Sequence, residues 1–376
     1  MVEENSSLAT TGCALPFVSI KFGLQIIVLT LHSGVLHILL VLFGRKKLFW
    51  DVAEYEPYLP DWTKLQDVGE GLDPHRINIT HNVIPVPCHS HNDYWRKHPL
   101  FDALRWGCIS VEADVWYFED RSNELFVGHN TASLRPENTF RSLYVNPLVD
   151  ILDSRNSYNS FSDGQGYGIF DTDPKQTLVL LVDFKTDGHI LYPHAKQQLE
   201  ALRRKDYLSY WDGSGFISRP VTVVGTGNAP FDLILKERDH RDIFFDAPLD
   251  FFGKAPARRK KRAQGQTGID LVTSPKDFNA SNSYYASTSF SASIGFPWTG
   301  AVTGKQLELI RDQIKGAHQQ GLKARYWETP NWPTSLRNYV WSVLVSQGTD
   351  ILNVDDLRSA TALDWNASVS HGWFDA

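Results

Sequence analysis

Hydrophobic and polar positions change their pattern along this 376-residue chain. A polar start is followed by a mostly apolar stretch from Ala14 to Phe43, which ends at the basic run Gly44 to Lys47. Residues 48–82 are polar and carry three prolines, which is typical of a linker. From Val83 onward, short apolar runs alternate with helical patterns. We therefore predict a tail with a membrane anchor or signal segment at 1–47, a linker at 48–82 and a folded domain at 83–376.

The window from Leu24 to Phe43 has about the twenty residues that a bilayer crossing requires. It predicts an N-terminal transmembrane helix and a single-pass membrane protein of the endomembrane or secretory pathway. A cleaved signal peptide is disfavoured, because the apolar stretch exceeds a signal core and no small-residue cleavage site follows. The side of the membrane stays open. The basic flank favours a cytosolic domain, whereas three N-glycosylation triplets favour a lumenal one: Asn78, Asn279 and Asn366.

Eight short runs in the folded domain predict strands: Val83–Cys88, Ile109–Val115, Leu125–Val127, Leu178–Phe184, Val221–Val224, Ile243–Phe245, Lys323–Trp327 and Ile351–Val354. Helical periodicity separates many of them and is clearest in Gly304 to Gln320. Strands that alternate with helices indicate a parallel α/β sheet. Because there are about eight strands and no G-x-G-x-x-G motif, we predict a closed (β/α)8 TIM-type barrel rather than an open sheet.

Charge and cysteine content narrow the function classes. The net charge of -6 gives no global basis for binding nucleic acid. The dense basic run from Arg258 to Arg262 is interpreted as a solvated loop insertion rather than a patch for anionic lipid headgroups or a processing site. The three cysteines lack metal-site spacing, and Cys88 and Cys108 are predicted to be small core residues. No feature of the chain indicates an obligate protein partner.

Two carboxylates, Glu112 and Asp114, lie two positions apart on a predicted strand. Residues at this spacing point to the same side of a strand, so both carboxylates face one way. Asp183 and Lys185 end the most apolar run with the same spacing and add a third carboxylate and a cation. Carboxylate oxygens are the ligands that Mg²⁺ and Ca²⁺ prefer. The pattern predicts one divalent cation, Mg²⁺ rather than Ca²⁺, held by the three acids. The alternative is a set of buried acids paired with nearby arginines.

Two histidines, His91 and His129, follow predicted strands near these acids. An imidazole moves protons near neutral pH, so the two are candidates for acid and base. A lone histidine is more often a hydrogen-bonded structural group, and His89 competes with His91 because it shares its side of the strand. All these residues fall at the carboxyl ends of predicted strands, where barrel active sites lie.

The ordered motifs H-x-H-N-D-Y, E-x-D, G-H-N and L-V-D-F-K resemble those of the PLC-like phosphodiesterase superfamily. This superfamily includes glycerophosphodiester phosphodiesterases and venom-type sphingomyelinase D enzymes, and the chain looks most similar to the fungal altered inheritance of mitochondria protein 6 family. The resemblance covers residues 83–357. It implies that His91 and His129 are the acid/base pair, that Lys185 contacts phosphate, and that Asn92 and Trp327 bind substrate.

The chain departs from the glycerophosphodiesterase pattern in two places. Those enzymes usually have His-Arg-Gly where this chain has His91, Asn92 and Asp93, so an expected phosphate-contacting arginine is missing. They also have Glu-x-Lys where this chain has Asp183-x-Lys185, as the sphingomyelinase D enzymes do. We expect a metal-dependent phosphoric diester hydrolase that acts on a glycerophosphodiester or phospholipid-type substrate. The alternative is a catalytically silent, membrane-anchored barrel that binds metal and phospho-ligand as a scaffold.

Overall fold

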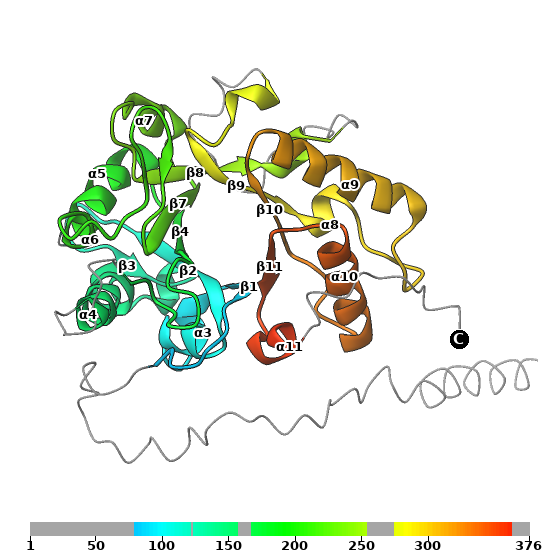
Figure 1. Ribbon diagram of the computed structural model, residues 1–376, viewed down its shortest axis with the longest axis horizontal. Coiled ribbons are helices and arrows are strands. Elements are labelled where there is room, and N and C mark those ends of the chain that lie inside the picture. The colour runs from blue at the N-terminus through cyan, green and yellow to red at the C-terminus, as the bar shows by residue number, and fades with distance from the viewer. Residues whose placement is uncertain (1–78, 122, 157–166, 254–273, 363–376) are drawn as a thin grey trace, which may run out of the picture. The chain divides into compact units, whose positions relative to one another are not determined.

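The computed structural model describes residues 79–121, 123–156, 167–253 and 274–362 (Figure 1). The chain divides into two units, and the one formed by Pro57–Asn331 and Leu336–Ala376 holds all the strands described below. The basic run Arg258–Arg262 and Cys13 lie outside the described residues.

The prediction of a single-pass membrane anchor needs correction. Within the described ranges, no helix is both long and apolar enough to cross a membrane. The segment on which that prediction rested, Ala14 to Phe43, lies outside these ranges. The structure therefore gives no support for a transmembrane helix or for the membrane localisation inferred from it.

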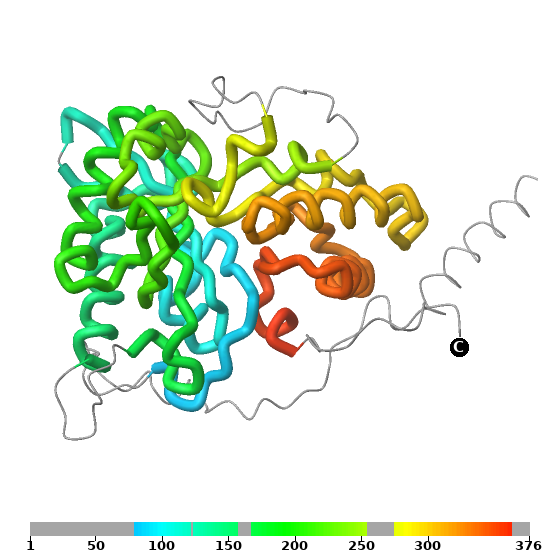
Figure 2. Tube along the Cα trace, turned by 45° about the horizontal axis from the view of Figure 1, so that its top comes forward, coloured from blue at the N-terminus to red at the C-terminus, as the bar shows by residue number. Residues whose placement is uncertain are grey.

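Eight parallel strands form a closed barrel, which confirms the predicted (β/α)8 TIM-type architecture. They follow one another around the barrel in chain order: β1 (Val86–Ser90), β2 (Cys108–Trp116), β4 (Leu178–Phe184), β7 (Val221–Gly227), β8 (Ile243–Pro248), β9 (Ser283–Ser289), β10 (Lys323–Trp327) and β11 (Ile351–Val354). The first strand closes the ring because it pairs in parallel with both β2 and β11. Figure 2 shows this closure, with the blue and red ends of the described chain side by side.

Helices follow most of the strands and pack on the outside of the barrel (Figure 1). For example, α3 contacts β2 and α9 contacts β10. The α-helices are α3 (Phe101–Arg105), α4 (Asn146–Arg155), α5 (Gly188–Gln198), α6 (Glu200–Arg203), α7 (Phe231–Lys236), α8 (Phe290–Ser293), α9 (Gly304–Gln319), α10 (Thr334–Ser346) and α11 (Leu357–Thr361). Three short strands lie outside the barrel: β3 (Phe126–Val127), β5 (Tyr210–Trp211) and β6 (Phe216–Ile217).

The predicted number of barrel strands was right, but one member was wrong. The run at Leu125 to Val127 forms β3, which pairs antiparallel with β2 and is not part of the barrel. The eighth barrel strand is β9, which was not predicted. Its sequence, SYYASTS, is rich in serine and lacks a continuous apolar run, and the buried Ser287 accepts from the guanidinium of Arg325.

Alternation along β4 separates two cores. Leu180 and Val182 belong to the large apolar core between the strands and the helices. Val179 and Leu181 point the other way, into a small cluster inside the barrel with Val224 of β7. Because side chains alternate with a period of two, Asp183 faces the interior above these residues. The apolar inner cluster therefore forms a floor beneath the polar end of the barrel.

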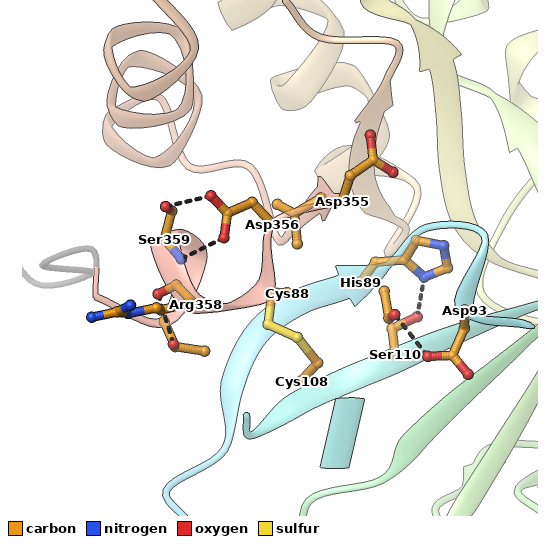
Figure 3. Close-up of a disulfide and its surroundings, with 12 residues drawn as sticks. Cys88, His89, Asp93, Cys108, Ser110, Asp355, Asp356, Arg358 and Ser359 are labelled. Carbon is orange, nitrogen blue, oxygen red and sulfur yellow. Dashed lines mark hydrogen bonds between the residues drawn. A yellow bond between two sulfur atoms is a disulfide. The ribbon is translucent and has the colours of Figure 1, made fainter. Parts of the chain in front are cut away.

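A disulfide joins Cys88 and Cys108, which were predicted to be small core residues (Figure 3). Both are fully buried, and they lie on the neighbouring strands β1 and β2 with Cα atoms 4.8 Å apart. The pairing of these strands shifts register between Val86 and His89, next to the disulfide. Beyond the shift, His89 lies opposite Ser110, so the carboxyl end of β1 is aligned with the acid-bearing part of β2.

Candidate active site

A cavity of about 280 Å³ lies at the carboxyl ends of the barrel strands. It is lined by all eight predicted site residues: His91, Asn92, Glu112, Asp114, His129, Asp183, Lys185 and Trp327. Sequence reasoning did not assign a role to several other residues in its lining, among them Thr226, Arg325, Asn353 and Asp355. The structure thus brings the predicted residues together, and their individual roles remain predictions.

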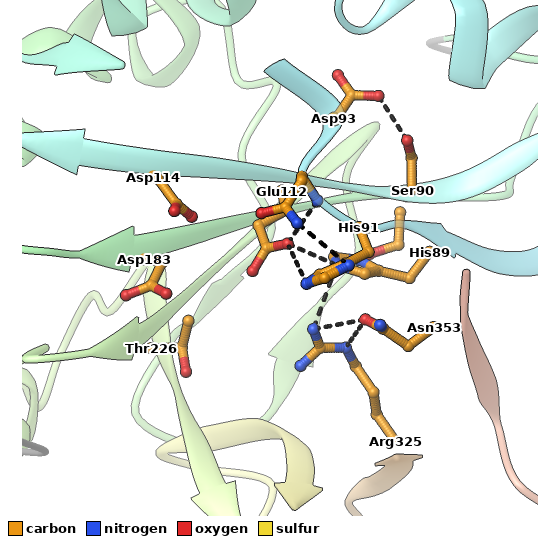
Figure 4. A network of polar contacts seen from close by, with 12 residues as sticks. His89, Ser90, His91, Asp93, Glu112, Asp114, Asp183, Thr226, Arg325 and Asn353 are labelled. Atoms are coloured by element: carbon orange, nitrogen blue, oxygen red, sulfur yellow. Dashed lines mark hydrogen bonds and ion pairs between the residues drawn. The ribbon is translucent and has the colours of Figure 1, made fainter. Parts of the chain in front are cut away.

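Three buried carboxylates form the centre of the cavity (Figure 4). Glu112 and Asp114 project from β2, and Asp114 lies directly opposite Asp183 of β4 in the parallel pairing. One oxygen from each of the three lies within 4.8 Å of the others. Lys185 bridges the two aspartates, with its Nζ 2.9 Å from Asp114 Oδ2 and 2.6 Å from Asp183 Oδ2.

Burial and mutual repulsion change the pKa values of these acids. Burial, together with the charges of Glu112 and Asp183, raises the pKa of Asp114 to about 8. Burial also raises the pKa of Asp183, although the ammonium of Lys185 opposes this change. The pKa of Glu112 is lowered despite burial, because the charges of His91 and Arg325 favour its ionised form. The single positive charge of Lys185 is thus insufficient to neutralise the three carboxylates.

The cluster fits a divalent cation. Asp114 Oδ2 accepts from Lys185 and Tyr94, whereas its Oδ1 is buried and has no hydrogen-bond partner among the described residues. A buried carboxylate oxygen without a partner is costly unless something else binds it. Hard oxygen ligands around one point are the donor set of Mg²⁺ and Ca²⁺. Glu112, Asp114 and Asp183 could therefore hold one such ion.

Gly227, at the end of β7, makes room for the carboxylate of Asp183. A Cβ atom at this position would lie 1.9 Å from Asp183 Oδ1. The backbone of Gly227 also has a φ of +65°, a conformation that residues other than glycine rarely adopt. Both observations explain why a glycine stands here, beside an acid that is forty-four positions earlier in the chain.

The H-N-D-Y motif folds as a tight turn after β1. Asn92 adopts the left-handed conformation, which asparagine tolerates better than most residues, and its backbone N–H donates to Glu112 Oε2 at 2.8 Å. Asp93 is fully buried and accepts from the hydroxyl of Ser90 and from the N–H of Leu100. The turn therefore locks Glu112 in place and leaves His91 at the cavity wall.

His91 is oriented by Asp355, which follows β11. Its Nδ1 lies 2.7 Å from Asp355 Oδ1, and its Nε2 lies 3.9 Å from Glu112 Oε2. A carboxylate only accepts, so Nδ1 carries the proton and Nε2 is left for the cavity. Burial opposes protonation, but Asp355 and Glu112 outweigh it and raise the pKa of His91. Asp355 was not predicted as a site residue, although it directly follows the predicted strand Ile351–Val354.

His89 has a different role from its neighbour. It is fully buried, its Nδ1 lies 2.7 Å from Ser110 Oγ, and its Nε2 lies 3.3 Å from Arg325 Nη2. A guanidinium can only donate, so Nε2 accepts and Nδ1 carries the proton. Burial and the charge of Arg325 lower the pKa of His89 to about 3. His89 is therefore a neutral structural group, and His91 is the better candidate for proton transfer.

His129 approaches the acids from another direction. Because β3 pairs antiparallel with β2, the chain leaving β3 returns alongside Asp114, and the N–H of Gly128 donates to the Asp114 carbonyl. His129 Nδ1 lies 3.7 Å from Asp114 Oδ2 and 3.3 Å from the hydroxyl of Tyr94. The ring of Trp95 packs beside it at 5.0 Å. Both candidate histidines thus border the same group of acids.

Similarity to known proteins identifies the family of this chain. Residues 77–246 match the AIM6-like phosphodiesterase domain. The altered inheritance of mitochondria protein 6 homolog of Arthroderma benhamiae is 38% identical over 75% of this chain and 85% of its own length. The chain belongs to the altered inheritance of mitochondria protein 6 family. The family proteins of Eremothecium gossypii and Saccharomyces cerevisiae are 35% and 34% identical, over 78% and 76% of this chain and 74% and 72% of theirs.

The family assignment confirms the resemblance that the motifs indicated. Among solved structures, a glycerophosphodiester phosphodiesterase from Parabacteroides distasonis superposes with a TM-score of 0.40 at 12% identity, over 72% of this chain and 94% of that one. The family match therefore supports a phosphodiesterase-type domain for the chain.

Proposed function

We propose that the protein is a metal-dependent phosphoric diester hydrolase that acts on a glycerophosphodiester or phospholipid-type substrate. The observation that carries the proposal is the buried group of three carboxylates with two histidines beside it in one cavity. The match to a phosphodiesterase domain model is consistent with this chemistry. A bound divalent cation would neutralise charge on the phosphoryl oxygens during the reaction.

The histidines carry out the proton transfers in this proposal. One Nε2 takes the proton of the attacking hydroxyl or water as its oxygen forms the new bond to phosphorus. The other imidazolium gives its proton to the leaving oxygen as the old phosphorus–oxygen bond breaks. Asp355 favours the protonated state of His91 through its 2.7 Å contact with Nδ1. The proton balance closes without any further reactant.

Lys185 and Asn92 serve the substrate in different ways. The Nζ of Lys185 is half-enclosed between Asp114 and Asp183, and it borders the cavity where a phosphate oxygen would lie. Burial opposes its charge, but the two aspartates raise the pKa of Lys185, so it stays cationic. Asn92 offers an amide, and the half-buried Trp327 offers an aromatic wall. We assign Lys185 to the phosphate and the other two to the flanking groups.

The test uses the full chain, stripped of metal and incubated with glycerophosphodiesters, lysophospholipids and sphingomyelin, with and without Mg²⁺. Phosphorus NMR separates the intact diester from a monoester and a cyclic phosphate. We expect Mg²⁺-dependent loss of diester that disappears in Asp183→Asn and in His129→Ala. If no diester is consumed although Mg²⁺ still raises the melting temperature, the hydrolase proposal fails and a metal-binding scaffold is the better account.

A further inference from the structure

Tyr94, the last residue of the H-N-D-Y motif, contacts both a candidate metal ligand and a candidate proton-transfer group. Its hydroxyl lies 2.7 Å from Asp114 Oδ2 and 3.3 Å from His129 Nδ1, and it also contacts Asn92 Oδ1. Only 9% of the residue is exposed. No other described side chain is found within hydrogen-bond distance of both an acid of the cluster and His129.

The hydroxyl has one proton to give, and this fixes the state of its partners. In the ionised state of Asp114, which is the state that binds a cation, the carboxylate and Asn92 Oδ1 can only accept, and the charged carboxylate is the stronger acceptor of this proton. Its contact with His129 therefore requires that Nδ1 of the imidazole be the donor. In the neutral ring, Nε2 is then the nitrogen without a proton. His91 reaches the same tautomer through Asp355, so both candidate histidines present Nε2 for proton transfer.

Tyr94 also distinguishes the two oxygens of Asp114. Oδ2 receives the hydroxyl of Tyr94 at 2.7 Å and the ammonium of Lys185 at 2.9 Å. Oδ1 has no hydrogen-bond partner in the described part of the chain. Two donors on one oxygen hold the carboxylate against rotation about its own axis. The oxygen left over is the one that can bind a cation.

We propose that Tyr94 is a positioning residue that orients Asp114 for the cation and His129 for proton transfer. The part concerning proton transfer rests on the hydrolase function proposed above, whereas the orientation of Asp114 and of the His129 ring does not. Groups that orient metal ligands and catalytic imidazoles typically change affinity or activity by about 10–100-fold when removed.

The test compares Tyr94→Phe with Tyr326→Phe in the full-length chain. Both variants delete a buried tyrosine hydroxyl, but that of Tyr326 contacts Gln313 of α9, outside the barrel. We expect Tyr94→Phe to lower kcat about 10–100-fold with little change in KM, and to weaken Mg²⁺ binding by a similar factor in titration calorimetry. Tyr326→Phe should change neither kcat nor Mg²⁺ affinity. A loss of thermal stability that both variants share would therefore reflect the deletion of a buried hydroxyl and not the positioning role of Tyr94.

Nitrogen-15 NMR of histidine-labelled protein gives a readout that needs no activity. Long-range proton–nitrogen spectra distinguish the two neutral tautomers, and His129→Ala identifies the signal of His129. We expect a proton on Nδ1 in the wild type and a mixture of tautomers in Tyr94→Phe. A proton on Nε2 of wild-type His129 would overturn the proposal, as would unchanged Mg²⁺ affinity and an unchanged His129 spectrum in Tyr94→Phe. If the wild type hydrolyses no diester, the proposed function fails, but the Mg²⁺ and NMR results still decide the role of Tyr94.

Discussion

The two sides of the cavity differ in how their charged groups are paired. On β2 and β4, three carboxylates face one another around a single lysine, and an oxygen of Asp114 is left without a partner among the described residues. Across the barrel, the guanidinium of Arg325 on β10 has a partner at each nitrogen: Asn353 Oδ1 at 2.8 Å, Ser287 Oγ at 3.3 Å, His89 Nε2 at 3.3 Å and Asp246 Oδ2 at 3.8 Å. We call these the acidic wall and the arginine wall.

This difference indicates that the acidic wall serves binding and catalysis and that the arginine wall serves stability. Like charges held close together cost folding free energy, which the acidic wall can recover when it binds a cation. Every nitrogen of the Arg325 guanidinium is paired, so the arginine wall supports the site without a ligand, although Asp246 Oδ1 also lacks a hydrogen-bond partner among the described residues. Substitutions on the acidic side should change binding and catalysis, and those on the arginine side should change stability.

The largest effect is expected for the proton-transfer group between the two walls. His91→Ala should lower the rate of diester hydrolysis about 100–10,000-fold, the usual contribution of a positioned acid or base. The side chain is 31% exposed, so the free energy of unfolding should change little. Enzyme assays and urea denaturation measure the two quantities. Retention of more than a tenth of the activity would remove His91 from the proposed pair, and loss of the Mg²⁺-induced rise in melting temperature would assign it to the cation instead.

A change in the arginine wall should act on stability. Arg325→Met keeps a long apolar stem but leaves Asp246 buried and without its cation, at an expected cost of about 3–5 kcal/mol in the free energy of unfolding. Lys323→Met, on the same strand, is the matched control. Its exposed ammonium lies over the ring of Tyr284, at 5.7 Å, and this contact should contribute about 0.5–1 kcal/mol. Equal losses in urea denaturation would refute the view of the arginine wall as a support.

Gly227→Ala should damage the acidic wall without changing any acid. The added methyl group would collide with Asp183 Oδ1, so we expect Mg²⁺ affinity in titration calorimetry to fall about 10–100-fold. Gly348→Ala is the control, because its φ of +87° is equally unfavourable for alanine but no atom lies within 4 Å of the added Cβ. If both variants lose only stability, Gly227 serves the backbone rather than the carboxylate.

The smallest effect concerns pH. Since the pKa of Asp114 is raised from 3.8 to about 8, its proton must leave when a cation binds. Mg²⁺ affinity should therefore rise by at most about tenfold between about pH 7 and pH 8, and then level off. The metal-free protein should lose stability over the same interval, because the folded state holds the Asp114 proton more tightly than the unfolded chain. Calorimetry in two buffers of different ionisation enthalpy counts the protons released, and a flat profile would contradict the shift.

The sequence predicted the parts of this site that depend on neighbouring positions. The E-x-D spacing of Glu112 and Asp114 and the apolar run before Asp183 were enough to place three acids at strand ends. It did not predict Asp355 as the partner of His91, because 264 positions separate the two and only closure of the barrel brings them together. Arg325 was missed for the same reason, since its partners lie on four other strands.

The fold was predictable where burial follows one simple pattern. β4 is buried on both faces and reads as a continuous apolar run, and it was found at its exact limits. β9 was missed because its buried serines make polar contacts rather than apolar packing; Ser287, for example, accepts a hydrogen bond from Arg325. The pairing of Cys88 with Cys108 was also not predictable, since a sequence separation of twenty positions does not determine the distance between them in space.

That disulfide has a further consequence for the H-N-D-Y turn, which lies within the covalent loop it closes, together with α3. If a protease cut the backbone between Cys88 and Cys108, both fragments would stay attached until a reductant was added. A nicked chain would thus keep the peptide that carries His91 and Tyr94 tethered to the strand that carries Glu112 and Asp114. Reassembly of these two pieces would be an intramolecular event, independent of protein concentration.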